Sequence, residues 1–125
     1  MIVDMAIPEI EFNLHDAVII NACFNEKGRL EADIELYEIF YPEKPVVKLV
    51  ISGIYNLQKV ELLVQDMKAD PCEEDWLGYR INAFHYDEKK QSTQENMYLY
   101  FDVEHNKPVK IHCKKVNFIV QGKIT

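Results

Sequence analysis

The sequence predicts a mainly β protein, an antiparallel sandwich or partly open barrel of about seven to eight strands. Polar and apolar residues alternate with a period of two along much of the chain, which is typical of strands that place one face on a core. Turn-forming residues separate these stretches at short intervals, as hairpin connections do. Because 125 residues is an ordinary length for one folded unit, a single domain spanning 1–125 is expected.

Two segments show the alternation most clearly. In RLEADIELY the apolar side chains occupy the even positions 30–36, and in MYLYFDVEH they occupy the odd positions 97–103. KPVVKLVISGI, NLQKVELLVQ and LGYRINAFHYD are rich in β-branched or aromatic residues, and each is expected to form a further strand. The stretches NEKG (25–28) and NKP (106–108) are typical of hairpin connections.

The second of these hairpins predicts a register. Pairing Val103 with Ile111 and Phe101 with Cys113 puts every apolar side chain on one side of the sheet. A register shifted by two residues keeps the same faces. Both alternatives are therefore open at the level of sequence.

Two irregularities interrupt the strand pattern. After Cys113 the apolar positions change from odd to even, which predicts a bulge at Lys114 and Lys115. In ADPCEEDWLG, Asp70 is a suitable N-cap and is followed by Pro, the residue favoured at the first helical position. One short helix near residues 71–77 is therefore expected.

The composition narrows the classes of partner and compartment. A formal net charge of −7 disfavours nucleic acid as a partner, because phosphate backbones are negative. No apolar run is long enough to cross a bilayer, so no membrane association is expected. The three cysteines, Cys23, Cys72 and Cys113, form no CxxC pair, which predicts neither a disulfide framework nor a zinc site. A cytoplasmic protein without metal or cofactor is expected.

The stretch EFNLHDAVII contains adjacent His15 and Asp16 in an otherwise apolar run. On a straight strand their side chains would point to opposite faces and could not exchange a proton, so no catalytic dyad is predicted. Asp16 is the only polar residue in the even-numbered apolar pattern of residues 10–24. Either the chain turns there and the carboxylate accepts backbone hydrogen bonds, or the carboxylate is buried and functional.

The strongest candidate for a binding surface is a row of acids on one strand face, Glu31, Asp33 and Glu35. Side chains two residues apart on a strand lie about 7 Å apart. Such a row is suited to attract a basic protein. His15 and Asp16 are the other binding candidates, and no residue is predicted to be catalytic or to bind a metal.

The segments EFNLHDAVI, ACFNEKGRLEADIEL and VVKLVISGIYNL, taken in this order, resemble a loose group of small bacterial proteins. Members of this group have an N-terminal strand with a His-Asp pair, then a hairpin, and some are similar to immunity proteins of toxin systems. The resemblance implies one mostly β domain and carries over no catalytic residue.

Three functional hypotheses follow. The first is a non-catalytic protein-binding module whose acidic surface engages a basic partner, as an immunity-like protein would. The second is an enzyme or carrier of a small ligand, with a site assembled across the strands of a barrel. The third is a self-associating structural protein, because the odd positions of AVIINACF carry Ala17 and Ile19 and would form a second apolar face.

Overall fold

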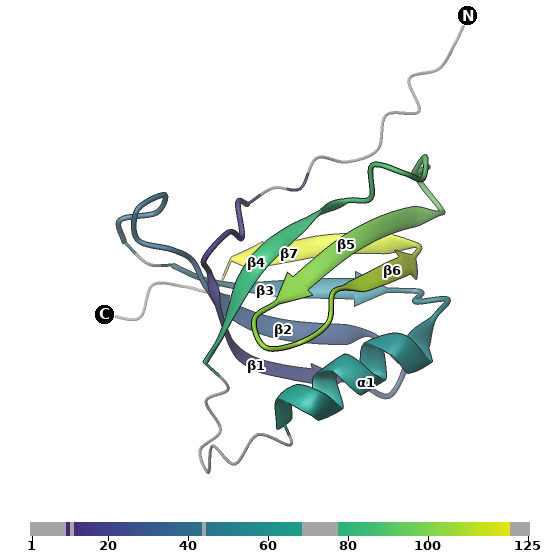
Figure 1. Ribbon diagram of the computed structural model, residues 1–125, viewed down its shortest axis with the longest axis horizontal. Coiled ribbons are helices and arrows are strands. Elements are labelled where there is room, and N and C mark those ends of the chain that lie inside the picture. Colours follow the sequence, from purple (N-terminus) through teal and green to yellow (C-terminus); the bar gives the residue numbers. More distant parts are fainter. Residues whose placement is uncertain (1–9, 11, 44, 69–77, 121–125) are drawn as a thin grey trace, which may run out of the picture.

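The computed structural model describes residues 10, 12–43, 45–68 and 78–120. Its strands are β1 (Val18–Phe24), β2 (Leu30–Glu35), β3 (Val46–Ser52), β4 (Tyr79–Tyr86), β5 (Met97–Val103), β6 (Val109–Cys113) and β7 (Lys115–Val120). A single helix in the described part, α1 (Leu57–Lys68), separates β3 from β4. The strands are antiparallel and lie in the order β6-β5-β4-β1-β2-β3-β7, so the prediction of a mainly β fold is confirmed (Figure 1).

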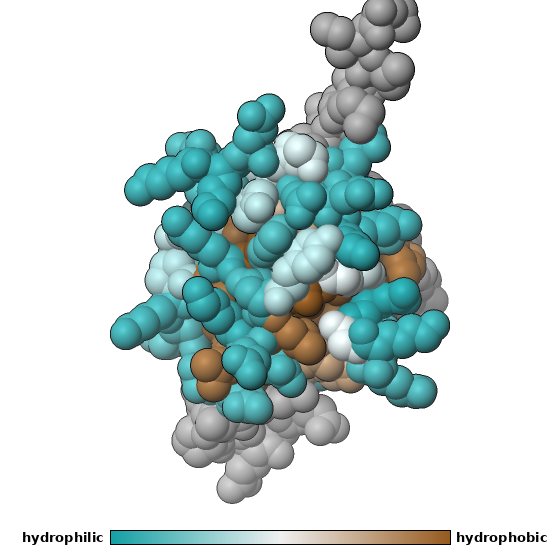
Figure 2. All heavy atoms as spheres, turned by 90° about the vertical axis from the view of Figure 1, so that its right-hand side faces the viewer, coloured by the Kyte–Doolittle hydropathy of each residue, from teal (hydrophilic) through white to brown (hydrophobic). Residues whose placement is uncertain are grey.

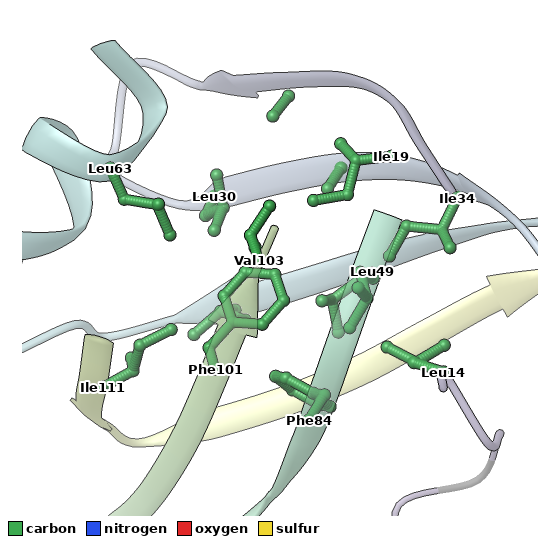
Figure 3. Close-up of a cluster of buried hydrophobic side chains, with 14 of the residues drawn as sticks. Leu14, Ile19, Leu30, Ile34, Leu49, Leu63, Phe84, Phe101, Val103 and Ile111 are labelled. Atoms are coloured by element: carbon green, nitrogen blue, oxygen red, sulfur yellow. The ribbon is translucent and has the colours of Figure 1, made fainter. Parts of the chain in front are cut away.

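The sheet consists of two halves joined by a short contact. One half contains β1, β2, β3 and β7, the other contains β4, β5 and β6, and two residue pairs between β1 and β4 link them. Side chains of both halves point into one interior, among them Leu30 and Leu49 from the first half and Phe84 and Phe101 from the second (Figure 3). The sheet is therefore curled around its core, but it is not closed into a barrel.

Lys114 is the corner at which the two edges of the sheet meet. The edge strands β6 and β7 are separated in sequence by this one residue. Its backbone N–H donates to the carbonyl oxygens of Ser52 and Gly53, at 3.1 Å each. The predicted bulge at Lys114 and Lys115 is therefore wrong. The change of phase marks instead a corner between two separate strands, β6 and β7. Val116 and Phe118 are half-buried beyond it, whereas the side chain of Val120 is exposed.

The side chain of Asn56 satisfies backbone hydrogen-bonding groups on the free edge of β6. Its side-chain amide donates to the carbonyl oxygen of Lys110 at 2.6 Å and accepts the N–H of His112 at 2.9 Å. The neighbouring N–H of Tyr55 donates to the carbonyl oxygen of His112 at 2.7 Å. The loop before α1 therefore occupies the place that another strand would take.

The prediction of a strand at NLQKVELLVQ is wrong, because this segment lies in α1. Its buried residues, Val60, Leu63, Val64 and Met67, recur at helical spacing and face the core. A helix covers an open end of the curled sheet with one apolar stripe, which a strand at this position could not do. The helix expected near residues 71–77 lies outside the described residues.

The predicted even-numbered apolar face of residues 10–24 is confirmed at its two ends, where Leu14 and Ala22 are buried and Phe12 and Phe24 pack against the core, and it is wrong in the middle. A register irregularity between Ile19 and Asn21 shifts the phase of β1, so that Ala17, Ile19 and Ala22 are buried. Ile20 is only half-buried on the other side. Because Ala17 and Ile19 face inward, the second apolar face that motivated self-association does not exist.

The hairpin connections at 25–28 and 106–108 are confirmed, but the predicted register of the second is wrong. Leu99 lies opposite Ile111 and Phe101 opposite Val109, a displacement of four residues from the expected pairing. The connection between β5 and β6 is longer than NKP indicated. Val103, at the end of β5, pairs with Ile81 of β4 and has no partner in the pairing of β5 with β6. The apolar faces agree with prediction because the shift is even.

Glycine is required more strictly at 53 than at 28. Both have positive φ, +64° and +73°, but a Cβ at Gly53 would meet the Lys114 side chain at 2.8 Å, whereas one at Gly28 would meet Leu57 at an ordinary 3.6 Å. Gly28→Ala should cost about 1 kcal/mol from backbone strain, and Gly53→Ala should cost at least about 2 kcal/mol because steric overlap adds to it. Denaturant unfolding measures the loss of stability in each variant. Equal losses would contradict the close packing of Lys114 against Gly53.

Candidate functional site

The three acids predicted on β2 lie in two different environments. Lys48 of β3 lies directly opposite Asp33, and its Nζ is 3.5 Å from Glu31 Oε1 and 3.9 Å from Asp33 Oδ1. Glu31 also accepts a hydrogen bond from the Asn25 amide at 3.3 Å. Partly exposed ion pairs contribute at most about 1 kcal/mol. Their effect here is to offset part of the negative charge of Glu31 and Asp33.

Glu35 lies at the end of β2 and has different neighbours. It lines a hollow of about 230 Å³ together with Asp16, Glu38 and Arg80. Three carboxylates and one guanidinium therefore gather there. The structure brings Glu35 and Asp16 together, although they are far apart in sequence, and leaves Glu31 and Asp33 on the strand face.

The chain turns at His15 and Asp16, as one of the two interpretations of Asp16 required. Asp16 has a φ of +62°, and its N–H donates to the carbonyl oxygen of Ile81 at 2.8 Å. The expectation that the two side chains point apart is wrong, because the turn brings His15 Nε2 within 3.4 Å of Asp16 Oδ2. The carboxylate is half-buried and contacts this ring, and no backbone N–H of the described residues donates to it, unlike what the interpretation supposed.

The contact between His15 and Asp16 lies at the protein surface, beside the hollow that Asp16 and Glu35 line. His15 Nδ1 lies 2.9 Å from the carbonyl oxygen of Asn82, and 57% of the histidine side chain is exposed. The described residues that line the adjacent hollow include no serine, threonine or cysteine. A histidine beside a carboxylate can donate and accept hydrogen bonds with a docked partner.

The loop that follows Glu35 was not singled out by the sequence. Residues Tyr37–Glu43 extend beyond the sheet at the left of Figure 1, and they expose 68% of Ile39 and 44% of Phe40. We refer to Asp16, Glu35, Glu38, Ile39 and Phe40 together as the loop end. The signal in the sequence was the apolar pair after Glu38, in a segment rich in turn formers.

The aromatic side chains on the outer face of β5 and β6 contact one another. The His112 ring stacks on Tyr98 at 4.4 Å and contacts Tyr55 at 4.3 Å. Lys90 lies over the Tyr98 ring and Lys114 over the Tyr55 ring, at 5.1 and 5.9 Å. The rings therefore contact one another and two ammonium groups, although 49% of Tyr55 stays exposed.

Asp87 is a buried carboxylate that sequence reasoning missed. Its Oδ1 accepts the backbone N–H of Lys89 at 3.0 Å, and its Oδ2 lies 3.5 Å from Lys110 Nζ. The hydrogen bond from Lys89 is the largest cause that holds the pKa of this carboxyl below its ordinary value. An Asp directly after a strand and before Glu-Lys-Lys is the signal of an Asx turn, so we assign Asp87 a structural role.

The described residues contain no group of three or more His, Cys, Asp or Glu placed to hold a metal ion. Within the same ranges, no helix is long and apolar enough to cross a membrane. Comparison with family models, curated proteins and solved structures finds no match to this chain. The fold and the loop end therefore define it as a curled antiparallel sheet with a candidate surface for protein binding.

The turn at Asp16 leads to a prediction about stability. Asn tolerates positive φ about as well as Asp, so Asp16→Asn should change the free energy of unfolding by less than about 0.5 kcal/mol. Asp16→Leu should cost about 1–2 kcal/mol, because a branched side chain is strained in that conformation. Denaturant unfolding of both variants tests this. An Asn variant as unstable as the Leu variant would instead show that the carboxylate charge stabilises the fold.

The two described cysteines should differ in reactivity. Burial raises the pKa of the Cys113 thiol to about 11, whereas Cys23 is exposed on β1. At pH 8 roughly one Cys113 in a thousand is then a thiolate. In a Cys72→Ser background, a thiol reagent should modify Cys23 in the native protein and Cys113 only in denaturant. Equal native rates at the two positions would contradict the burial of Cys113.

Proposed function

We propose that this chain is a non-catalytic protein-binding module that docks through the loop end onto a basic partner. The observation that carries the proposal is the exposure of Ile39 and Phe40 beside three carboxylates. Large apolar side chains at the centre of an interface, with charged groups at its rim, are the usual arrangement of a binding hot spot. The side of the molecule that faces the viewer in Figure 2, opposite the loop, is mostly polar and charged and has an apolar area near its centre.

The loop is held in shape before any partner arrives. The N–H groups of Phe40 and Tyr41 both donate to the carbonyl oxygen of Tyr37, at 3.1 and 2.9 Å. The Tyr37 and Phe40 rings meet edge to face at 5.7 Å. Tyr41 fastens the loop to the body, because its hydroxyl accepts the N–H of Asn13 at 2.9 Å. Less conformational entropy is then lost on binding.

The chemistry of the loop end selects the class of partner. Asp16, Glu35 and Glu38 would attract Lys and Arg and accelerate association with a basic surface, and the apolar tip would slow dissociation. A basic toxin is the partner that the resemblance to immunity proteins implies. An enzyme or ligand carrier with its site inside a barrel has less support, because core side chains fill the interior (Figure 3).

Affinity capture from the source cell tests this proposal. The wild-type chain should recover a basic protein, and Ile39→Asp should weaken its binding at least tenfold, because a charge replaces an apolar anchor. Glu35→Lys should lower mainly the association rate, measured with the recovered protein by surface plasmon resonance. Ile119→Asp is the matched control, since Ile119 is 54% exposed on β7, outside the loop end. Binding that is equal in wild type and Ile39→Asp would refute the proposal.

A further inference from the structure

An open groove of about 1040 Å³ runs between α1 and the loop that joins β5 to β6. Leu62 of α1 lines it and is 58% exposed, so it offers apolar surface to an occupant. Val109 and Pro108 add apolar surface on the other side. The volume is at the upper end of those that hold small ligands, so two large side chains would fit.

The charges around this groove are mainly positive. Lys59 lines it from the helix, and Lys107 and Lys110 line it from the loop side, with Asp66 as an acid on the same rim. Lys110 is engaged with Asp87, as described above. Over the described ranges, no ion pair involves Lys59 or Lys107. An occupant with carboxylates would therefore meet at least two ammonium groups that form no ion pair with a carboxylate of the described residues.

The charges of the chain are unevenly divided along its length. Residues 12–43, which include the loop end, contain seven Asp or Glu and two Lys or Arg. Residues 78–120, which supply one wall of the groove, contain five Asp or Glu and seven Lys or Arg. One molecule thus offers an acidic apolar projection and a basic apolar groove.

We propose that the groove binds the Tyr37–Glu43 loop of a second copy of this chain. Ile39 and Phe40 of one copy would contact Leu62 and Val109 of the other, and the carboxylate of Glu38 would approach Lys59 or Lys107. The loop extends from the left of Figure 1 and α1 lies at the lower right, so the two surfaces do not coincide. The contact is therefore head-to-tail and leaves a free loop and a free groove at the ends of each assembly.

Mixing two variants tests the proposal on the full chain. Ile39→Asp removes the apolar tip and keeps the groove, and Leu62→Glu adds a repelling charge to the groove and keeps the loop. By sedimentation velocity, wild type should form oligomers that grow with concentration and weaken at least tenfold at about 1 M salt, where charges are screened. Each variant alone should be a monomer. An equimolar mixture should form one-to-one heterodimers, because one intact loop then meets one intact groove.

Three results would overturn this inference. The first is a wild-type chain that stays monomeric at all concentrations, even if the groove then binds an acidic peptide of another protein. The second is a mixture of the two variants that forms no heterodimer. The third is loss of self-association in the matched control Ile119→Glu, which would place the contact on β7. None of them bears on the partner captured by the loop end, so the two proposals fail separately.

Discussion

The single residue between β6 and β7 constrains the whole fold. Strands at opposite edges of a seven-stranded sheet cannot be joined by Lys114 unless the sheet curls until its edges meet. The backbone bonds from Lys114 to Ser52 and Gly53 hold that meeting point, and the absence of a side chain at Gly53 makes room for it. Curling also gives the apolar face of every strand one shared interior, so burial of the core and closure of the corner support each other.

The curled sheet leaves the ends of the molecule as its available surfaces. On the outer face of β2 and β3, Lys48 offsets part of the charge of Glu31 and Asp33. On the outer face of β5 and β6, tyrosine, histidine and lysine side chains cover one another. Exposed apolar side chains beside charged groups occur at the loop after β2 and beside α1, and β7 exposes Ile119 and Val120 as well. Both proposals of binding therefore concern connections at the ends and not strand faces.

The prediction of the acidic row on β2 shows how far sequence could go toward a site. Alternation placed Glu31, Asp33 and Glu35 on one face, and this is confirmed by the burial of the residues between them. It could not place Lys48 opposite Asp33, because that depends on the register between strands that no local pattern specifies. Nor could it bring Asp16 to Glu35, since the two meet only through the pairing of β1 with β2. The exposure of Ile39 was likewise invisible, because exposure depends on what the rest of the fold covers.

By itself the sequence determined the fold class, the hairpin connections and the inward faces of β2 and β5, because alternation and turn chemistry are local properties. Tertiary structure decided the rest. It converted an apolar segment at 57–68 into a helix, since a stripe of buried side chains was needed at the end of the sheet. It shifted the phase of β1 at Ile20 and set the register of β5 with β6. The helix, the phase of β1 and the register of β5 with β6 depend on contacts between segments that are distant in the sequence. Those contacts stabilise the fold only once the core is assembled.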